Sequence, residues 1–224
     1  MSSRDDVLAA IRQSLSRGTG DGPPEEVTDR LAAKNRNLIP ARATGLDRAG
    51  LIETFERYAS NVDVTFDRVG NLAAVPETIA AYLSAQNLPA KAVRAPDPLL
   101  DEVPWDTFPT LDVRAGVPLN EDQVGVTSAA AGIAETGTCM MLSGPEHPST
   151  LNFLPETQIV VLPADRLVAA PEDAWDLVRD AGSLPRTVNM VTGPSRSGDI
   201  EQTILLGAHG PRRLHIVLVD GSEA

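Results

Sequence analysis

A single acidic residue, Glu135, lies among small and apolar residues in the segment Gly-Ile-Ala-Glu-Thr-Gly-Thr, residues 132–138. The apolar run Cys-Met-Met-Leu (139–142) follows directly and predicts a buried strand. Because an unpaired buried carboxylate is costly, Glu135 needs either a charge partner or a pocket in which it works. In a pocket the carboxylate is a candidate general base, nucleophile or acceptor for a ligand hydroxyl. The competing interpretation is a structural ion pair with an arginine at the edge of the core.

The residues around Glu135, from 127 to 138, are mostly small. Small residues permit a close approach of the backbone either to a ligand or to a neighbouring helix. On the first interpretation we take Thr127, Gly132, Thr136 and Gly137 as candidate ligand-binding residues.

The segment Gly-Pro-Ser-Arg-Ser-Gly-Asp-Ile-Glu (193–201) follows a predicted strand and is predicted to open a helix over 198–206. Free N–H groups at a helix start bind anions, and arginine adds a planar, permanently charged donor. We therefore take Ser195, Arg196, Ser197 and Asp199 as candidates for holding a phosphate or carboxylate. The alternative is simple capping of the helix by Ser197 and Asp199. The segment has neither the Walker pattern nor Gly-x-Gly-x-x-Gly.

A third segment, Gly-Ala-His-Gly-Pro-Arg-Arg (207–213), places His209 in a tight turn. His209 is a candidate catalytic acid–base or hydrogen-bond donor beside Glu135, although a lone turn histidine is more often structural. The two arginines that end the segment are either solvated or the charge partner that Glu135 needs. His147 is a weaker candidate for lining a site at the end of the predicted strand 138–143, and an exposed loop is the favoured alternative. His215, inside an apolar strand, is predicted to be structural. The three histidines are scattered without zinc-ligand spacing, so no metal site is predicted.

Local patterns divide the chain into an N-terminal helical arm with its linker, residues 1–44, and a single α/β domain, residues 45–224. The arm is expected to pack on a neighbouring subunit or to support a homodimer, and the alternative is a partly disordered tail. In the domain, strands alternate with helices, which predicts an open, mostly parallel sheet in three Rossmann-like layers. Ligand sites of such sheets lie beyond the carboxyl ends of the strands, where we expect all three segments to meet. The predicted helices are 3–17, 25–36, 46–59, 76–86, 171–181 and 198–206, and the predicted strands are 62–66, 91–94, 123–127, 138–143, 157–162, 187–192 and 214–219.

The bulk composition excludes several classes of protein. A net charge of −12 argues against non-specific binding to nucleic acid or to an anionic membrane. A single cysteine, Cys139, cannot by itself build an iron–sulfur cluster or a disulfide framework. The sequence has neither a secretory signal pattern nor an apolar run long enough to span a membrane. We therefore expect a cytoplasmic protein.

Taken in order, five motifs resemble those of the lactate utilization protein C family (LutC/YkgG), which carries the LUD domain. They are the segments 132–138, Leu-Pro-Ala-Asp-Arg-Leu-Val (162–168), 193–201, Leu-Gly-Ala-His-Gly-Pro-Arg (206–212) and Leu-His-Ile-Val-Leu-Val-Asp (214–220). The resemblance covers about residues 45–221. It implies a fold like that of ribose-5-phosphate isomerase, glucosamine-phosphate deaminase and CoA transferases (NagB/RpiA/CoA-transferase-like). It also implies a part in oxidising L-lactate to pyruvate together with two iron–sulfur partner proteins.

Three functional hypotheses follow. The first is a non-redox component of a lactate-oxidising assembly, without a cofactor of its own, that binds iron–sulfur partners and a small anionic ligand. The sequence has no flavin or nicotinamide fingerprint, and removing two electrons from lactate requires a cofactor. The second is an independent enzyme, resembling CoA transferases or sugar-phosphate isomerases, in which Glu135 is the nucleophile or base and His209 assists. The third is a non-catalytic binding or regulatory module.

Overall fold

The structure of the protein is a computed structural model, which describes residues 3–15, 22–36, 39–200 and 203–221. Contacts divide the chain into two units, Met1–Ile39 and Pro40–Ala224. The first unit contains α1 (Ser3–Ser14) and α2 (Glu25–Ala33), neither of which buries a residue. Acidic residues occupy the first turn of each helix, where the helix dipole favours negative charge. The predicted helices at 3–17 and 25–36 are thus confirmed in shortened form.

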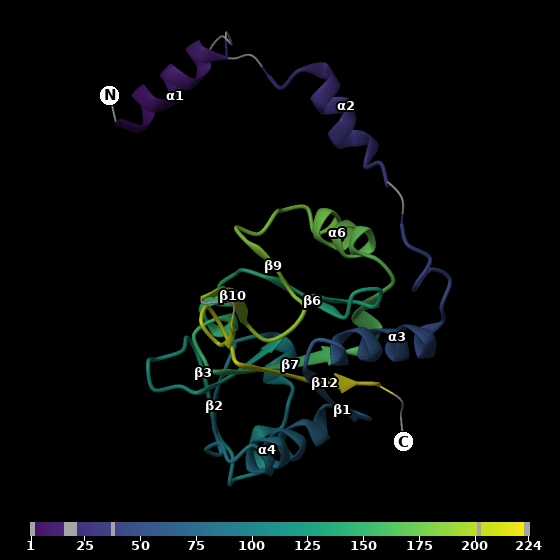
Figure 1. The fold of residues 1–224 in the computed structure, drawn as a ribbon, viewed down its shortest axis with the longest axis vertical. Coiled ribbons are helices and arrows are strands. Elements are labelled where there is room, and N and C mark those ends of the chain that lie inside the picture. Colours follow the sequence, from purple (N-terminus) through teal and green to yellow (C-terminus); the bar gives the residue numbers. More distant parts are fainter. Residues whose placement is uncertain (1–2, 16–21, 37–38, 201–202, 222–224) are drawn as a thin grey trace. The chain divides into compact units, whose positions relative to one another are not determined.

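A six-stranded sheet forms the centre of the second unit (Figure 1), and all of its neighbouring strands pair in parallel. Its strand order is β1-β12-β7-β4-β2-β3. The predicted open parallel α/β sheet is therefore confirmed. Its strands are β1 (Val64–Val69), β2 (Lys91–Arg94), β3 (Asp112–Ala115), β4 (Val124–Ser128), β7 (Thr157–Pro163) and β12 (Arg213–Val219).

One face of this sheet is covered by α4 (Val75–Ala85), which lies below the sheet in Figure 1. Ile79 and Leu83 of α4 are fully buried in the core that this helix forms with β7, β4 and β12. His215 of β12 stacks on Tyr82 with ring centroids 3.9 Å apart, and its Nδ1 lies 2.9 Å from the Thr65 hydroxyl. His215 is thus the hydrogen-bonded structural residue predicted from its apolar strand.

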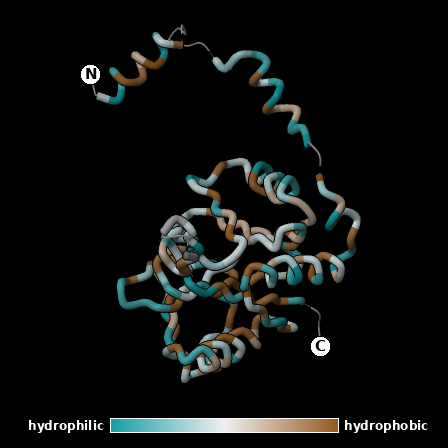
Figure 2. The backbone as a smooth tube through the Cα atoms, in the orientation of Figure 1, coloured by the Kyte–Doolittle hydropathy of each residue, from teal (hydrophilic) through white to brown (hydrophobic). Residues whose placement is uncertain are grey.

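The other face is covered by α3 (Arg48–Ser60) and by a second, four-stranded sheet (Figure 1). The second sheet has the order β8-β5-β6-β9 and contains β5 (Ala131–Ile133), β6 (Thr138–Leu142), β8 (Leu167–Val168) and β9 (Val188–Val191). The amphipathic α6 (Pro171–Asp180) covers the outer side of this sheet through Ala174 and Val178. Coloured by hydropathy, the strands of the central sheet are among the most apolar parts of the chain (Figure 2).

The predicted helix over 198–206 is wrong. This segment is an antiparallel hairpin of β10 (Arg196–Ile200) and β11 (Thr203–Leu206). The sequence already contains a reason, because Thr203 and Ile204 are β-branched and Gly198 weakens a helix. The helix start proposed as an anion site at residues 195–199 therefore does not exist.

The remaining elements are short and join the main strands. They are α5 (Pro98–Asp101) and the 3-10 turns η1 (Leu72–Ala74), η2 (Trp105–Thr107), η3 (Ser149–Asn152) and η4 (Ala164–Arg166). No helix within the described ranges has the length and apolar character needed to cross a membrane.

Candidate functional site

Glu135 lies in the turn between β5 and β6 and is 5% exposed. Its backbone N–H donates to the carbonyl of Ala169 at 3.2 Å, which ties the turn to the start of α6. The buried Oε2 atom has no hydrogen-bond partner among the described residues. Burial raises the pKa of the carboxyl, the nearby Glu172 raises it further, and Arg42 acts in the opposite direction.

The arginine partner of the alternative interpretation is not found within the described part of the chain, where no ion pair involves the Glu135 carboxylate. The backbone N–H groups of Arg212 and Arg213 both donate to the carbonyl of Glu156, at the start of β7. Glu135 is therefore a buried carboxylate with a raised pKa, held in a turn rather than neutralised by a salt bridge.

The glycines near Glu135 contact the protein itself. A Cβ atom on Gly137 would lie 2.7 Å from the Cα of Ala59 and 2.8 Å from the carbonyl carbon of Tyr58, both at the end of α3. A Cβ on Gly132 would meet the side chain of Leu167 at 2.6 Å. Of the two interpretations of these small residues, the close approach to a neighbouring helix accounts for Gly137.

The threonines of the same segment also have partners within the fold. The hydroxyl of Thr136 donates to that of Thr138 at 2.8 Å, and Thr138 lies 2.9 Å from the hydroxyl of Thr192. Thr127 is buried and accepts a long hydrogen bond of 3.4 Å from Gln158.

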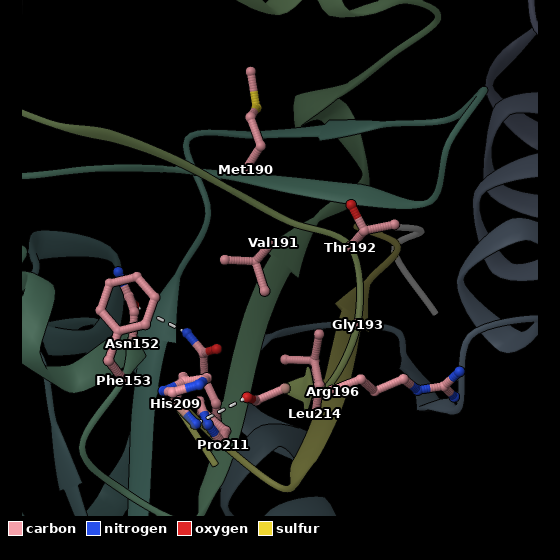
Figure 3. Close-up of a pocket in the computed structure, with 13 residues that line it drawn as sticks. Asn152, Phe153, Met190, Val191, Thr192, Gly193, Arg196, His209, Pro211 and Leu214 are labelled. Atoms are coloured by element: carbon pink, nitrogen blue, oxygen red, sulfur yellow. Dashed lines mark hydrogen bonds between the residues drawn. The ribbon is translucent and has the colours of Figure 1, made fainter. Parts of the chain in front are cut away.

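Ser195, Arg196 and His209 line a cavity of about 270 Å³ (Figure 3). It lies at the amino edge of the central sheet, opposite the carboxyl edge at which these residues were expected. We call this the amino-edge cavity, because Gln158 and Leu214, which also line it, stand near the starts of β7 and β12. The expectation that all three segments meet at the carboxyl edge is thus wrong, since 193–200 and 207–211 precede β12. Glu135 is not among the residues that line the cavity.

Within the amino-edge cavity, the backbone N–H of His209 donates to the Ser195 hydroxyl oxygen at 3.3 Å. Arg196 instead forms an ion pair with Asp63, and its side chain extends away from His209 (Figure 3). Ser197 is buried in β10 opposite Leu205, so it caps no helix. Asp199 belongs to β10 by its backbone, and its side chain falls outside the described part. The arrangement offers a hydroxyl and an imidazole but no free arginine.

A second polar cluster, which the sequence interpretation missed, occupies the carboxyl edge of the sheet. Asp97 follows β2, Ser128 ends β4 and Arg166 follows β7, so three neighbouring parallel strands deliver them to one place. Asp97 accepts a hydrogen bond from the Ser128 hydroxyl, and its Oδ2 lies 3.6 Å from Nδ1 of His147. The available signal was position: each of the three residues stands at or just after the end of a strand.

Ser128, His147 and Arg166 line a cavity of about 260 Å³, which we call the carboxyl-edge cavity. Of the two interpretations of His147, the structure favours the site-lining one: the side chain is only partly exposed, lines this cavity and is directed at Asp97. Within the described residues, no group of three or more metal-ligating side chains is close enough to hold a metal ion.

Comparison with known proteins finds a family model that matches the part of the chain carrying both cavities. Residues 119–219 match the family model described as the LUD domain. The match covers just under half of the chain. The match confirms the resemblance drawn from the five sequence motifs, and Glu135, Ser128, Arg166 and His209 all lie within the matched range. Asp97 precedes the matched range.

Curated relatives of this chain carry the name Lactate utilization protein C. The protein from Anoxybacillus flavithermus is 34% identical over 98 residues, 43% of this chain and 44% of that relative. The protein from Exiguobacterium sp. is 27% identical over 232 residues, 98% of this chain and 96% of that relative. The protein from Bacillus subtilis is 33% identical over 100 residues, 43% of this chain and 42% of that relative. The stronger identities are thus confined to under half of each relative's length.

The fold of the chain also resembles a solved structure. A crystal structure of a DUF162 family protein from Deinococcus radiodurans superimposes with a TM-score of 0.59 at 24% identity. The match covers 78% of this chain and 99% of that one, and it supports the α/β fold.

Proposed function

We propose that this protein is a non-redox component of an L-lactate-utilising system, in which it acts with iron–sulfur partner proteins in the oxidation of lactate to pyruvate. The observation that carries the proposal is the alignment over 98% of the chain with a protein named Lactate utilization protein C. Oxidising lactate removes two electrons, and these require a cofactor. The cytoplasmic location expected from the sequence is part of the same proposal.

The cysteine content of the chain supports the proposal that the partner proteins, rather than this chain, bind the iron–sulfur clusters. Iron–sulfur clusters are bound by several cysteine thiolates, whereas this chain has one cysteine. Cys139 is fully buried in β6, and burial raises the pKa of its thiol to about 12. A thiol in that state is a poor ligand, because the thiolate is the form that binds iron.

Contact with a partner is assigned to the face around the amino-edge cavity. Phe153 and Met190 line the cavity and are 43% and 40% exposed. Leu206, paired with Arg196 in the β10–β11 hairpin, is 47% exposed. Clustered exposed apolar side chains mark interaction surfaces, and aromatic residues and methionine are enriched in them. His209 and Ser195 on the same face would accept polar groups of the partner or of a small carboxylate.

Reconstitution tests this proposal. Pyruvate formed from L-lactate is measured with the two iron–sulfur proteins of the same system, with and without this chain. We expect activity only in the complete mixture, a loss of most of it with Met190→Glu, and no loss with the control Val117→Glu, which changes an exposed valine in the loop after β3. Full activity of the two partners without this chain would overturn the proposal. Light scattering on the isolated chain tests the expected homodimer separately.

One observation favours a second candidate function, an independent acyl-transfer enzyme with Glu135 as nucleophile. The Oε2 atom of Glu135 is buried but forms no hydrogen bond within the described residues, and such a reaction needs a carboxylate oxygen that is not already bound. Incubation with acetyl-CoA, followed by hydroxylamine trapping and mass spectrometry, would label Glu135 in the native protein and not in Glu135→Gln. An unlabelled Glu135 would remove this candidate.

A further inference from the structure

Arg166 holds a fixed position at the carboxyl edge of the sheet. Its Nη1 donates to the carbonyl of Ala129 at 2.9 Å, directly after β4. No carboxylate of the described residues forms an ion pair with its half-buried guanidinium. The adjacent Asp165 is exposed and does not pair with it. A half-buried arginine that is anchored by one N–H and has no counter-charge is suited to a ligand carboxylate.

The polar groups next to Arg166 at the carboxyl edge are also held in place by hydrogen bonds. Asp97 is 3% exposed, and its Oδ1 accepts the N–H of Leu99 at 2.9 Å while its Oδ2 accepts the Ser128 hydroxyl. Asp97 itself is not among the residues that line the cavity. Its negative charge is therefore covered by Ser128 and His147. The polar groups that line the cavity are the Arg166 guanidinium, the His147 imidazole and the Ser128 hydroxyl oxygen, whose proton is donated to Asp97.

A second and more apolar cavity of about 320 Å³ adjoins the carboxyl-edge cavity. The two cavities share Ala130, Leu142 and Arg166. Beyond Arg166 and the exposed Asp165 next to it, this cavity is lined by Met140 of β6 and by Leu177 and Val178 of α6. A charged anchor at one end and an apolar compartment at the other are the usual composition of a small-molecule site.

We propose that the two joined cavities at the carboxyl edge of the sheet bind a carboxylate that carries an apolar chain. The carboxylate contacts Arg166 and His147, and the chain lies between β6 and α6 against Met140, Leu142 and Leu177. The location agrees with the general rule that open parallel sheets bind ligands beyond the carboxyl ends of their strands. Lactate itself, with a single methyl group, would leave the apolar compartment empty.

The test is direct binding to the full chain, measured by calorimetry with three probes: octanoate, octanol and L-lactate. Each methylene buried from water strengthens binding by about fourfold, so octanoate should bind at least about 50-fold more tightly than lactate. Octanol lacks the charge and should bind at least about 10-fold more weakly than octanoate. Equal affinities for octanoate and lactate, or for octanoate and octanol, would overturn the proposal.

Matched variants locate the site. Arg166→Gln should weaken octanoate at least about 10-fold and leave octanol unchanged, because charge-assisted hydrogen bonds are stronger than neutral ones. Arg179→Gln is the control, since Arg179 lies on α6, pairs with Asp176 and does not line either cavity. Leu177→Ser, at a side chain that is 51% exposed, should weaken octanoate and octanol alike.

A second polar variant keeps the test decisive if Arg166→Gln does not fold. His147→Gln, at a side chain that is 36% exposed, should weaken octanoate more than octanol. Octanoate affinity that is unchanged in both His147→Gln and Leu177→Ser would place the ligand elsewhere and overturn the proposal.

Discussion

Replacing Gly137 with alanine tests whether the turn that carries Glu135 is fixed by its contact with α3. Gly137 has φ +65°, a left-handed conformation that disfavours side chains. A Cβ atom there would lie 2.7 Å from the Cα of Ala59 and closer still to its backbone nitrogen. Both obstacles are backbone atoms, which cannot rotate away as a flexible side chain would.

The expected loss of stability has two parts. Placing a non-glycine residue in the left-handed region costs about 1–2 kcal/mol. Forcing an extra methyl group into a packed site costs about 1–3 kcal/mol more. Gly137→Ala should therefore lower the free energy of unfolding by about 2–5 kcal/mol. At about 2–4 °C per kcal/mol for a chain of this size, the melting temperature falls by about 4–20 °C.

Two other glycines separate these contributions. Gly182 has φ +75° and nothing within 4 Å of the position that a Cβ would take, so Gly182→Ala should lose only the dihedral part. Gly144 has neither a positive φ nor a neighbour within 4 Å, so Gly144→Ala should change stability by less than about 0.5 kcal/mol. Urea denaturation gives the three values. If Gly137→Ala and Gly182→Ala lose the same amount, the close packing of the turn on α3 is refuted.

Three further predictions concern titration, reactivity and the surface. Burial lowers the pKa of His215 to about 4, below the value near 6.5 of the unfolded chain. The contribution of the neutral imidazole to the free energy of unfolding is therefore fully present above pH 6.5 and is lost as the pH falls toward 4. Urea midpoints between pH 7 and 4 should show this loss, and His215→Gln should show a smaller one. Cys139, with its raised pKa and full burial, should react with a thiol reagent only after denaturation, and rapid labelling of the native protein would contradict its position. Because Arg196 and Asp63 form an exposed pair, Arg196→Ala should cost less than about 1 kcal/mol in thermal unfolding, and a larger loss would mean that the pair is structural.

Much of the element pattern could be predicted from local sequence. Strand β2 begins and ends at the residues expected, Lys91 and Arg94. Helix α6 begins at Pro171, whose fixed φ suits a first turn, with Asp173 accepting from the N–H of Ala170. These features depend on neighbours within one turn of the chain, so the sequence contains them directly.

The sequence misled where distant pairing decides the structure. The segment 198–206 begins with a capping pattern that suggested a helix, yet it pairs as a hairpin, which its β-branched residues and Gly198 also favour. Two strands of the second sheet were predicted, at 138–143 and 187–192, but β5 and β8 were missed, since they are only three and two residues long. Strands this short carry too little alternation to be recognised.

By itself, the sequence determined the α/β class, the apolar strands, the isolated carboxylate Glu135 and the ordered motifs of the LUD domain. Only the tertiary structure decided which of the candidate residues meet. The order β1-β12-β7-β4-β2-β3 carries Ser195 and His209 to the amino edge and Asp97, Ser128 and Arg166 to the carboxyl edge. The physical reason is that strand order is set by the packing of both faces of the sheet, a non-local quantity. Two residues that are far apart along the chain become neighbours only when their strands do.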